Sequence, residues 1–184
     1  MKDQPIIKTK RLLLRPFTLN DAKDVQRLAG MKEVAETTLN IPHPYEDGMA
    51  EEWISGHKKN LEEDKTITYA ITSKDNTELI GAISLVLNLR HQNAEVGYWI
   101  GVPFWNNGYC TESLKAIIRY GFEELKLNRI HAHHYVRNEA SGKVMQKAGM
   151  QFEGYHRQYV ISNGVFEDVK SYAILKSDLQ ELSK

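Results

Sequence analysis

The chain has 184 residues, of which 41% are hydrophobic and 26% are charged, a composition that excludes a disordered chain and fits one globular domain. Its 24 Lys and Arg residues balance 24 Asp and Glu residues, so no net positive field attracts nucleic acid, and we expect no nucleic-acid partner. The single cysteine excludes an intramolecular disulfide, and without a secretory segment or an apolar stretch near ~20 residues we expect a cytoplasmic protein without a membrane span.

The first third of the sequence predicts one strand and two helices. Alternating residues predict a strand over 11–17. Thr18 and Asp21 have the spacing of a capping box, so we expect a helix to follow them. Apolar residues repeat every four positions from Met49 to Leu61, which predicts an amphipathic helix over 47–64.

Strand patterns dominate the remainder of the chain. Three successive strands are expected over 66–73, 79–88 and 94–101, a series that favours an antiparallel meander. A long helix is expected from Gly108, then a strand over 129–136 and a short helix with Asn138 as N-cap and Gly149 as its stop. Two closing strands, over 154–161 and 166–175, join at a turn over 162–164. With no repeat or linker, residues 1–184 are expected to form a single domain.

The most informative segment covers residues 95–124, where a strand, a glycine-bearing loop and a helix N-terminus follow one another. A helix N-terminus offers unpaired N–H groups and the positive end of the helix dipole. Gly108 lets the backbone approach a phosphate without a Cβ in between, although a loop glycine can equally serve only a turn. The segment therefore predicts a phosphate site.

Two motifs in the second half resemble a known family. Residues 97–114, GYWIGVPFWNNGYCTESL, are similar to the acyl-CoA-binding motif of the GNAT superfamily of N-acetyltransferases. Residues 137–150, RNEASGKVMQKAGM, resemble the helix that follows it in the RimJ/RimL-like, ribosomal-protein-alanine branch, and RLLLRPFTLNDA near the N-terminus is also typical of that branch. The resemblance is vague from about residue 30 to 65, where amine substrates usually differ.

The resemblance implies an α/β (α+β) fold. It implies a mixed, mostly antiparallel seven-stranded sheet with helices on both faces and a central splay that holds acetyl-CoA.

Lys143 is implied to meet the adenosine phosphate, yet it could be a solvated surface charge, and Asn138 could simply cap its helix. Two residues depart from the family pattern, Trp105 for Arg or Gln and Cys110 for Gly or Ala. The implied cofactor-binding residues are Trp99, Ile100, Gly101, Val102, Asn106, Asn107, Gly108, Tyr109, Cys110, Thr111, Asn138, Ser141 and Lys143.

Acetyl transfer to an amine requires a base, an oxyanion donor and, where the thiolate is assisted, an acid. Glu95 is the candidate base, with a solvent-facing strand carboxylate as the alternative. The family often places a Tyr proton donor where this chain has Met145, so Ser141, one turn earlier on the same helical face, becomes the candidate acid. The N–H near Ile100 is the expected oxyanion donor. Cys110 lacks a neighbouring base in sequence, so we expect direct transfer and no acyl-enzyme on this residue.

Three histidines in one strand raise the question of a metal. Strand alternation sends His134 to the face opposite His131 and His133, which leaves two ligands, so we expect no metal. The expected acceptor is a primary amine, and the family resemblance favours the N-terminal amine of a protein. A small amine such as a polyamine, an amino acid or an antibiotic is the alternative, as is a non-catalytic acyl-CoA-binding module. The sequence leaves the oligomeric state open, with a homodimer among the candidates.

Overall fold

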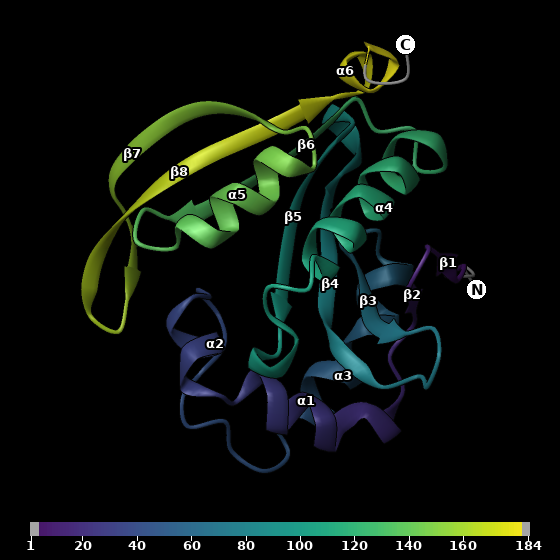
Figure 1. Cartoon of the computed structure of the whole chain (residues 1–184), viewed down its shortest axis with the longest axis vertical. Helices are drawn as coiled ribbons and strands as arrows, with labels where there is room; N and C mark the ends of the chain where they lie inside the picture. Colours follow the sequence, from purple (N-terminus) through teal and green to yellow (C-terminus); the bar gives the residue numbers. More distant parts are fainter. Residues whose placement is uncertain (1–3, 182–184) are drawn as a thin grey trace.

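A computed structural model describes residues 4–181, and its centre is one twisted sheet (Figure 1). Within these residues the sheet has eight strands in the order β1-β2-β3-β4-β5-β6-β8-β7. Their bounds are β1 Ile7–Lys8, β2 Leu12–Arg15, β3 Thr66–Ser73, β4 Leu79–Asn88, β5 Asn93–Ile100, β6 Arg129–Tyr135, β7 Gln151–Ser162 and β8 Val165–Leu175. Neighbours run antiparallel except β5 and β6, which are parallel. The mixed, mostly antiparallel fold is therefore confirmed.

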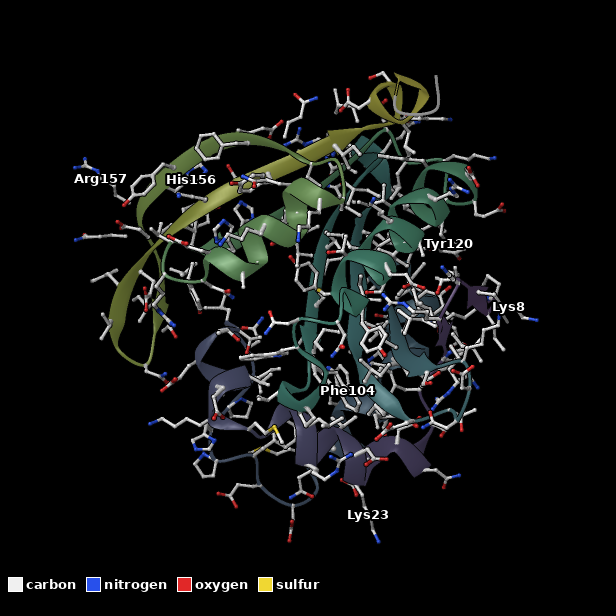
Figure 2. All side chains as sticks on the ribbon, viewed as in Figure 1. Lys8, Lys23, Phe104, Tyr120, His156 and Arg157 are labelled. Carbon is white, nitrogen blue, oxygen red and sulfur yellow. The ribbon has the colours of Figure 1, made fainter. Side chains whose placement is uncertain are left out.

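Helices cover both faces of the sheet. Their bounds are α1 Ala22–Ala29, α2 Lys32–Glu36, α3 Met49–Glu62, α4 Tyr109–Glu123, α5 Glu139–Lys147 and α6 Lys176–Glu181. Alternation along β3 shows the two faces: Tyr69 packs into the core under α4 and α5, whereas Ala70 packs into the core under α1, α2 and α3. Phe104 contacts both cores, and Figure 2 shows its side chain near the centre of the molecule, with Lys8, Lys23 and Arg157 pointing outward.

The strand count differs from the expected seven because of β1, which has two residues. A pair of residues shows no periodicity, so this strand is defined only by its antiparallel pairing with β2. The helix α2 is also missed, because five residues are too few to show a helical period. No helix among the described residues is long and apolar enough to span a bilayer.

The chain enters α1 through the predicted capping box. The Asp21 side chain, 9% exposed, accepts hydrogen bonds from the Thr18 backbone N–H at 2.8 Å and from the Arg15 guanidinium at 2.6 and 2.8 Å. Burial raises the pKa of Asp21, but the bonds from Arg15 and Thr18 outweigh it and hold the pKa below its usual value. This network fixes the start of α1, which contacts β5 and lies with α2 and α3 on one face of the sheet.

Asp21→Asn is expected to lower the free energy of unfolding by about 2–3 kcal/mol at pH 7, since it leaves Arg15 half-buried without its partner. Because the folded-state pKa is depressed, the carboxylate stabilises the fold above the unfolded pKa of ~3.9, and this contribution disappears as the pH falls through the folded value. Urea unfolding at pH 7 and pH 3 should thus show a smaller difference at pH 3. Asp24→Asn, which breaks an exposed pair with Arg27, is the control and should change stability by less than ~0.5 kcal/mol. Equal losses in both variants would contradict the assignment.

Candidate active site

The site lies where β5 and β6 separate. Their parallel pairing runs from Asn93 opposite Arg129 to Glu95 opposite His131 and then stops, although β5 continues to Ile100. Figure 1 shows the two strands diverging from this point. A cavity of about 860 Å³, within the usual range for small-molecule sites, is lined by residues of β5, β6, α4 and α5. The sheet therefore has the expected central splay, and Glu95 lies where it begins.

One end of the cavity meets the N-terminus of α4. Gly108 is the N-cap of this helix with φ +77°, a left-handed conformation that glycine adopts without strain, and the N-cap makes no side-chain hydrogen bond to the helix N–H groups. The Trp105 indole N–H donates to the Ile100 carbonyl at 2.7 Å and ties the preceding loop to the end of β5. The geometry suits an anion, as the sequence predicts.

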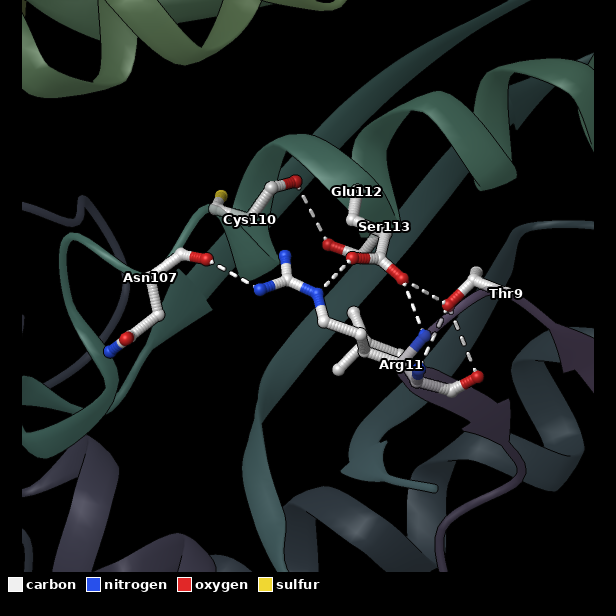
Figure 3. A network of polar contacts seen from close by, with 7 residues as sticks. Thr9, Arg11, Asn107, Cys110, Glu112 and Ser113 are labelled. Atoms are coloured by element: carbon white, nitrogen blue, oxygen red, sulfur yellow. Dashed lines mark hydrogen bonds and ion pairs between the residues drawn. The ribbon is translucent and has the colours of Figure 1, made fainter. Parts of the chain in front are cut away.

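Arg11, near the N-terminus of the chain, holds this loop in place by hydrogen bonds that the sequence did not predict. Its Nη1 donates to the Asn107 carbonyl at 2.9 Å and its Nε donates to Glu112 at 2.7 Å, as Figure 3 shows. Burial raises the pKa of Glu112, but hydrogen bonds from Thr9 and Arg11 hold it below its usual value. An acidic residue in the first turn of α4 is thereby paired with a cation and does not oppose anion binding.

Most of the predicted cofactor-binding residues line the cavity: Trp99, Ile100, Asn106, Gly108, Tyr109, Cys110, Thr111, Asn138, Ser141 and Lys143. Three of them, Gly101, Val102 and Asn107, are not part of the lining. Gly101 is buried so closely against Leu28 that an added Cβ would lie 2.7 Å from the leucine, and Val102 packs against the core under α1. The sequence motif is continuous, but the short turn after β5 points these residues toward α1.

Asn138 performs the capping role that sequence reasoning kept as its alternative. Its Oδ1 accepts from the Ser141 backbone N–H at 3.2 Å, and its Nδ2 donates to the Thr37 carbonyl at 3.3 Å, which links α5 to the end of α2. Lys143 is exposed and lies at the cavity edge. Both residues are thus placed beside the cavity, and their contact with a cofactor remains a prediction.

Glu95 has a partner that the sequence did not reveal. One carboxylate oxygen lies 3.2 Å from Nδ1 of His133, and this bond is the main reason that the pKa of Glu95 is lowered, against a smaller opposing effect of burial. The His133 ring stacks on Tyr159 of β7, with 5.7 Å between ring centroids. Glu95 thus stays ionised at neutral pH and is oriented by a histidine from the neighbouring strand.

Tyr98 lies on the opposite face of β5, three positions after Glu95. Its hydroxyl is 2.9 Å from the Ser141 hydroxyl of α5, a contact between residues 43 apart in the sequence. Burial raises the pKa of Tyr98 well above its usual value, so the phenol remains protonated. Met145, at the position where the sequence resemblance often implies a tyrosine, is 1% exposed and belongs to the core. The cavity therefore has a carboxylate on one side of β5 and a pair of hydroxyls on the other.

The family follows from comparison with known proteins. The model described as "Acetyltransferase (GNAT) domain" matches residues 11–151 of the chain. The chain belongs to the GNAT family. "Uncharacterized N-acetyltransferase YoaA" of Bacillus subtilis (strain 168) is 35% identical over 94% of this chain and 97% of its own length.

Two further proteins extend this comparison. The solved structure of a GNAT-family acetyltransferase from Bacillus anthracis has a TM-score of 0.83 and 26% identity, covering 94% of this chain and 99% of that chain. The "[Ribosomal protein uS5]-alanine N-acetyltransferase" of Escherichia coli (strain K12) is 29% identical over 102 residues, which are 54% of this chain and 53% of that protein. The GNAT resemblance seen in the sequence is confirmed, and the chain is an N-acetyltransferase.

In this GNAT enzyme the single cysteine, Cys110, is half-buried in the first turn of α4. Burial raises the pKa of Cys110 to about 12, so its thiol is protonated at neutral pH. The thiolate is the nucleophilic form of cysteine, and no histidine is hydrogen-bonded to this residue within residues 4–181. The environment of Cys110 favours a packing role beside the loop.

The other end of the GNAT cavity is formed by the segment where the resemblance is vague. The loop between α2 and α3 and the start of α3 contribute a mostly apolar wall with a few neutral polar groups. Its residues are Thr37, Thr38, Leu39, Asn40, Ile41, Pro42, Tyr45, Met49 and Trp53. Glu95 is the one carboxylate in the cavity lining of the described chain. This end therefore offers an apolar surface next to a single negative charge.

Proposed function

We propose that this enzyme transfers the acetyl group of acetyl-CoA directly to a primary amine, and that the acceptor is the N-terminal amine of a peptide or protein. The observation that carries the proposal is the position of Glu95, the single carboxylate of the cavity, at the point where the sheet opens. An attacking amine must lose a proton, and a carboxylate within the cavity can accept it directly or through one water.

Bound acetyl-CoA supplies a thioester carbonyl as the electrophile. In the proposal, the N–H groups around Gly108 and the first turn of α4 bind its phosphates, with Lys143 at the cavity edge as an added cation. Glu95 accepts the amine proton, while His133 keeps the carboxylate ionised and holds its orientation. His133 is thus a positioning residue. This division of roles needs no covalent acyl-enzyme.

Ser141 is proposed to donate a proton to the departing thiolate. Tyr98 stays protonated, and its hydroxyl lies 2.9 Å from the Ser141 hydroxyl, so either group can donate in this bond. In the proposal the phenol donates, which leaves the serine proton free to point into the cavity. Tyr98 therefore orients the acid. This arrangement replaces the tyrosine that the family often uses and that is Met145 in this chain.

The charge of the acceptor end favours a peptide over a polyamine. A polyamine carries several positive charges, and each needs a partner when it leaves water. The cavity supplies one carboxylate beside an apolar wall, which matches one amine followed by uncharged groups. The E. coli relative is named as an N-acetyltransferase for an alanine of ribosomal protein uS5. Because the amine of an alanine is free only at a protein N-terminus, this name also supports a protein N-terminus as the acceptor.

An acceptor panel tests the proposal. We expect acetyl-CoA and an alanine-starting peptide to release free CoA thiol at a rate at least about tenfold above that with spermidine, an amino acid or an aminoglycoside, since a missing charge partner costs more than ~1.4 kcal/mol. The control is a peptide of the same length whose N-terminus is blocked and whose only free amine is an internal lysine. We expect no acetylation of this lysine. Faster turnover of spermidine would contradict the peptide acceptor and favour the small-amine alternative.

A further inference from the structure

A group of three potential metal ligands lies at the start of the splay. Ligand atoms of Glu95, His131 and His133 all lie within 4.8 Å of one another. We propose that these three side chains bind a Zn²⁺ ion, and that the bound ion inhibits the enzyme by occupying its general base. The binding site stands on the geometry alone, whereas the inhibition rests on the role proposed for Glu95.

The fold brings the three ligands together through register. His131 and His133 are two apart on β6 and so point to one face of the sheet. Glu95 is the parallel register partner of His131, which places its side chain on that same face. His134 points to the other face, where its ring meets Gly142 of α5. Sequence alternation thus predicted the histidine faces, but not the third ligand from the neighbouring strand.

The separations suit a tetrahedral ion. Zn–N and Zn–O bonds of ~2.0–2.1 Å place neighbouring ligand atoms about 3.3–3.5 Å apart. Glu95 and His133 are already 3.2 Å apart, and the remaining separations of 4.8 Å or less close by small side-chain rotations. Two imidazoles and one carboxylate with a fourth position open form a common zinc ligand set, and such nitrogen ligands favour Zn²⁺ over Mg²⁺.

The surroundings also suit a cation. Arg129, two residues before His131, forms a bidentate pair with Glu153, so its charge is balanced next to the site. The stacking of His133 on Tyr159 orients one ligand ring. Glu95 and His131 also line a second cavity of about 530 Å³, together with Asn88, Asn93 and one cation, Arg90. This cavity gives an ion a route that does not pass through the larger one.

Calorimetric titration of ZnCl₂ into the CoA-free protein tests binding without reference to activity. We expect one Zn²⁺ per chain, and at least about tenfold weaker binding in His131→Val, since loss of even an outer-sphere partner costs ~10–100-fold in metal affinity. Valine keeps the strand propensity of the position. His91→Ala, which removes an exposed histidine outside the group, is the matched control and should bind like the parent. MgCl₂ should give no comparable heat.

Activity is measured separately, as acetyl-peptide formed, because Zn²⁺ also binds the CoA thiol. His131 has no assigned catalytic role, so His131→Val should keep the parent rate when EDTA removes metal ions. When Zn²⁺ is added without EDTA, the concentration that halves the rate should be at least about tenfold higher for this variant than for the parent. Absence of Zn²⁺ binding to the parent, or equal binding by His131→Val, overturns the site. Unchanged inhibition of that variant overturns the inhibitory mechanism. Tight binding by a chain that acetylates no tested amine leaves the site intact and counts against the proposed function.

Discussion

Glu95→Gln is expected to lower turnover at pH 7 by about 100-fold or more, the usual size of a general-base effect. Glutamine has nearly the same shape but cannot accept the amine proton, and it retains a donor and an acceptor that can face His133. Terminal amines have a reference pKa of ~8, so roughly a tenth are neutral at pH 7 and most are neutral at pH 9. The loss should therefore shrink as the pH rises. Initial rates with a confirmed acceptor between pH 6 and 9 measure it.

Two variants separate this effect from a general disturbance. Glu78→Gln, an exposed carboxylate outside the cavity, should keep the parent rate at every pH. Ser141→Ala should lose turnover without recovery at high pH, because the leaving thiolate still lacks its donor. If Glu95→Gln follows the parent curve throughout, Glu95 is only a strand carboxylate, and another group or bulk water accepts the proton.

Gly108→Trp is expected to weaken CoA binding by at least about 100-fold, or ~2.7 kcal/mol, as measured by calorimetry. The indole would project from the N-cap of α4, where the backbone N–H groups are open to an anion. An added Cβ at this position would lie 3.5 Å from Nη2 of Arg11, so the larger ring would also disturb the loop brace. Both effects remove the surface that the phosphates are proposed to contact.

The control for this variant must share its backbone strain. Gly164, in the turn between β7 and β8, has φ +78° against +77° at Gly108, and nothing lies within 4 Å of an added Cβ there. Gly164→Trp should therefore have a similar conformational cost and unchanged CoA affinity. If Gly108→Trp folds and binds CoA as tightly as Gly164→Trp does, the proposal that the CoA phosphates bind at the start of α4 is wrong.

Local sequence determined the elements whose pattern is complete within a few residues. The expected strands over 66–73 and 79–88 agree with β3 and β4 at both ends, because alternation and the polar turn between them depend on near neighbours. The capping box at Thr18 and the N-cap at Asn138 were predictable for the same reason. The GNAT motif adds the order of strand, loop and helix that builds the anion site. The family likeness is strong in the segment that is proposed to bind CoA and vague from about residue 30 to 65, the segment that forms the apolar wall of the cavity.

Tertiary structure decided which side chains meet. The Glu95–His133 contact joins residues 38 apart, the Tyr98–Ser141 contact joins residues 43 apart, and Arg11 reaches Glu112 across 101 residues. None of these pairs has a sequence spacing that fixes it, because each depends on strand register and on how a helix packs across the sheet. The sequence could assign His131 and His133 to one face, since alternation is local. Only the parallel pairing of β5 with β6 placed Glu95 beside them, because that register is set by packing on both faces of the sheet.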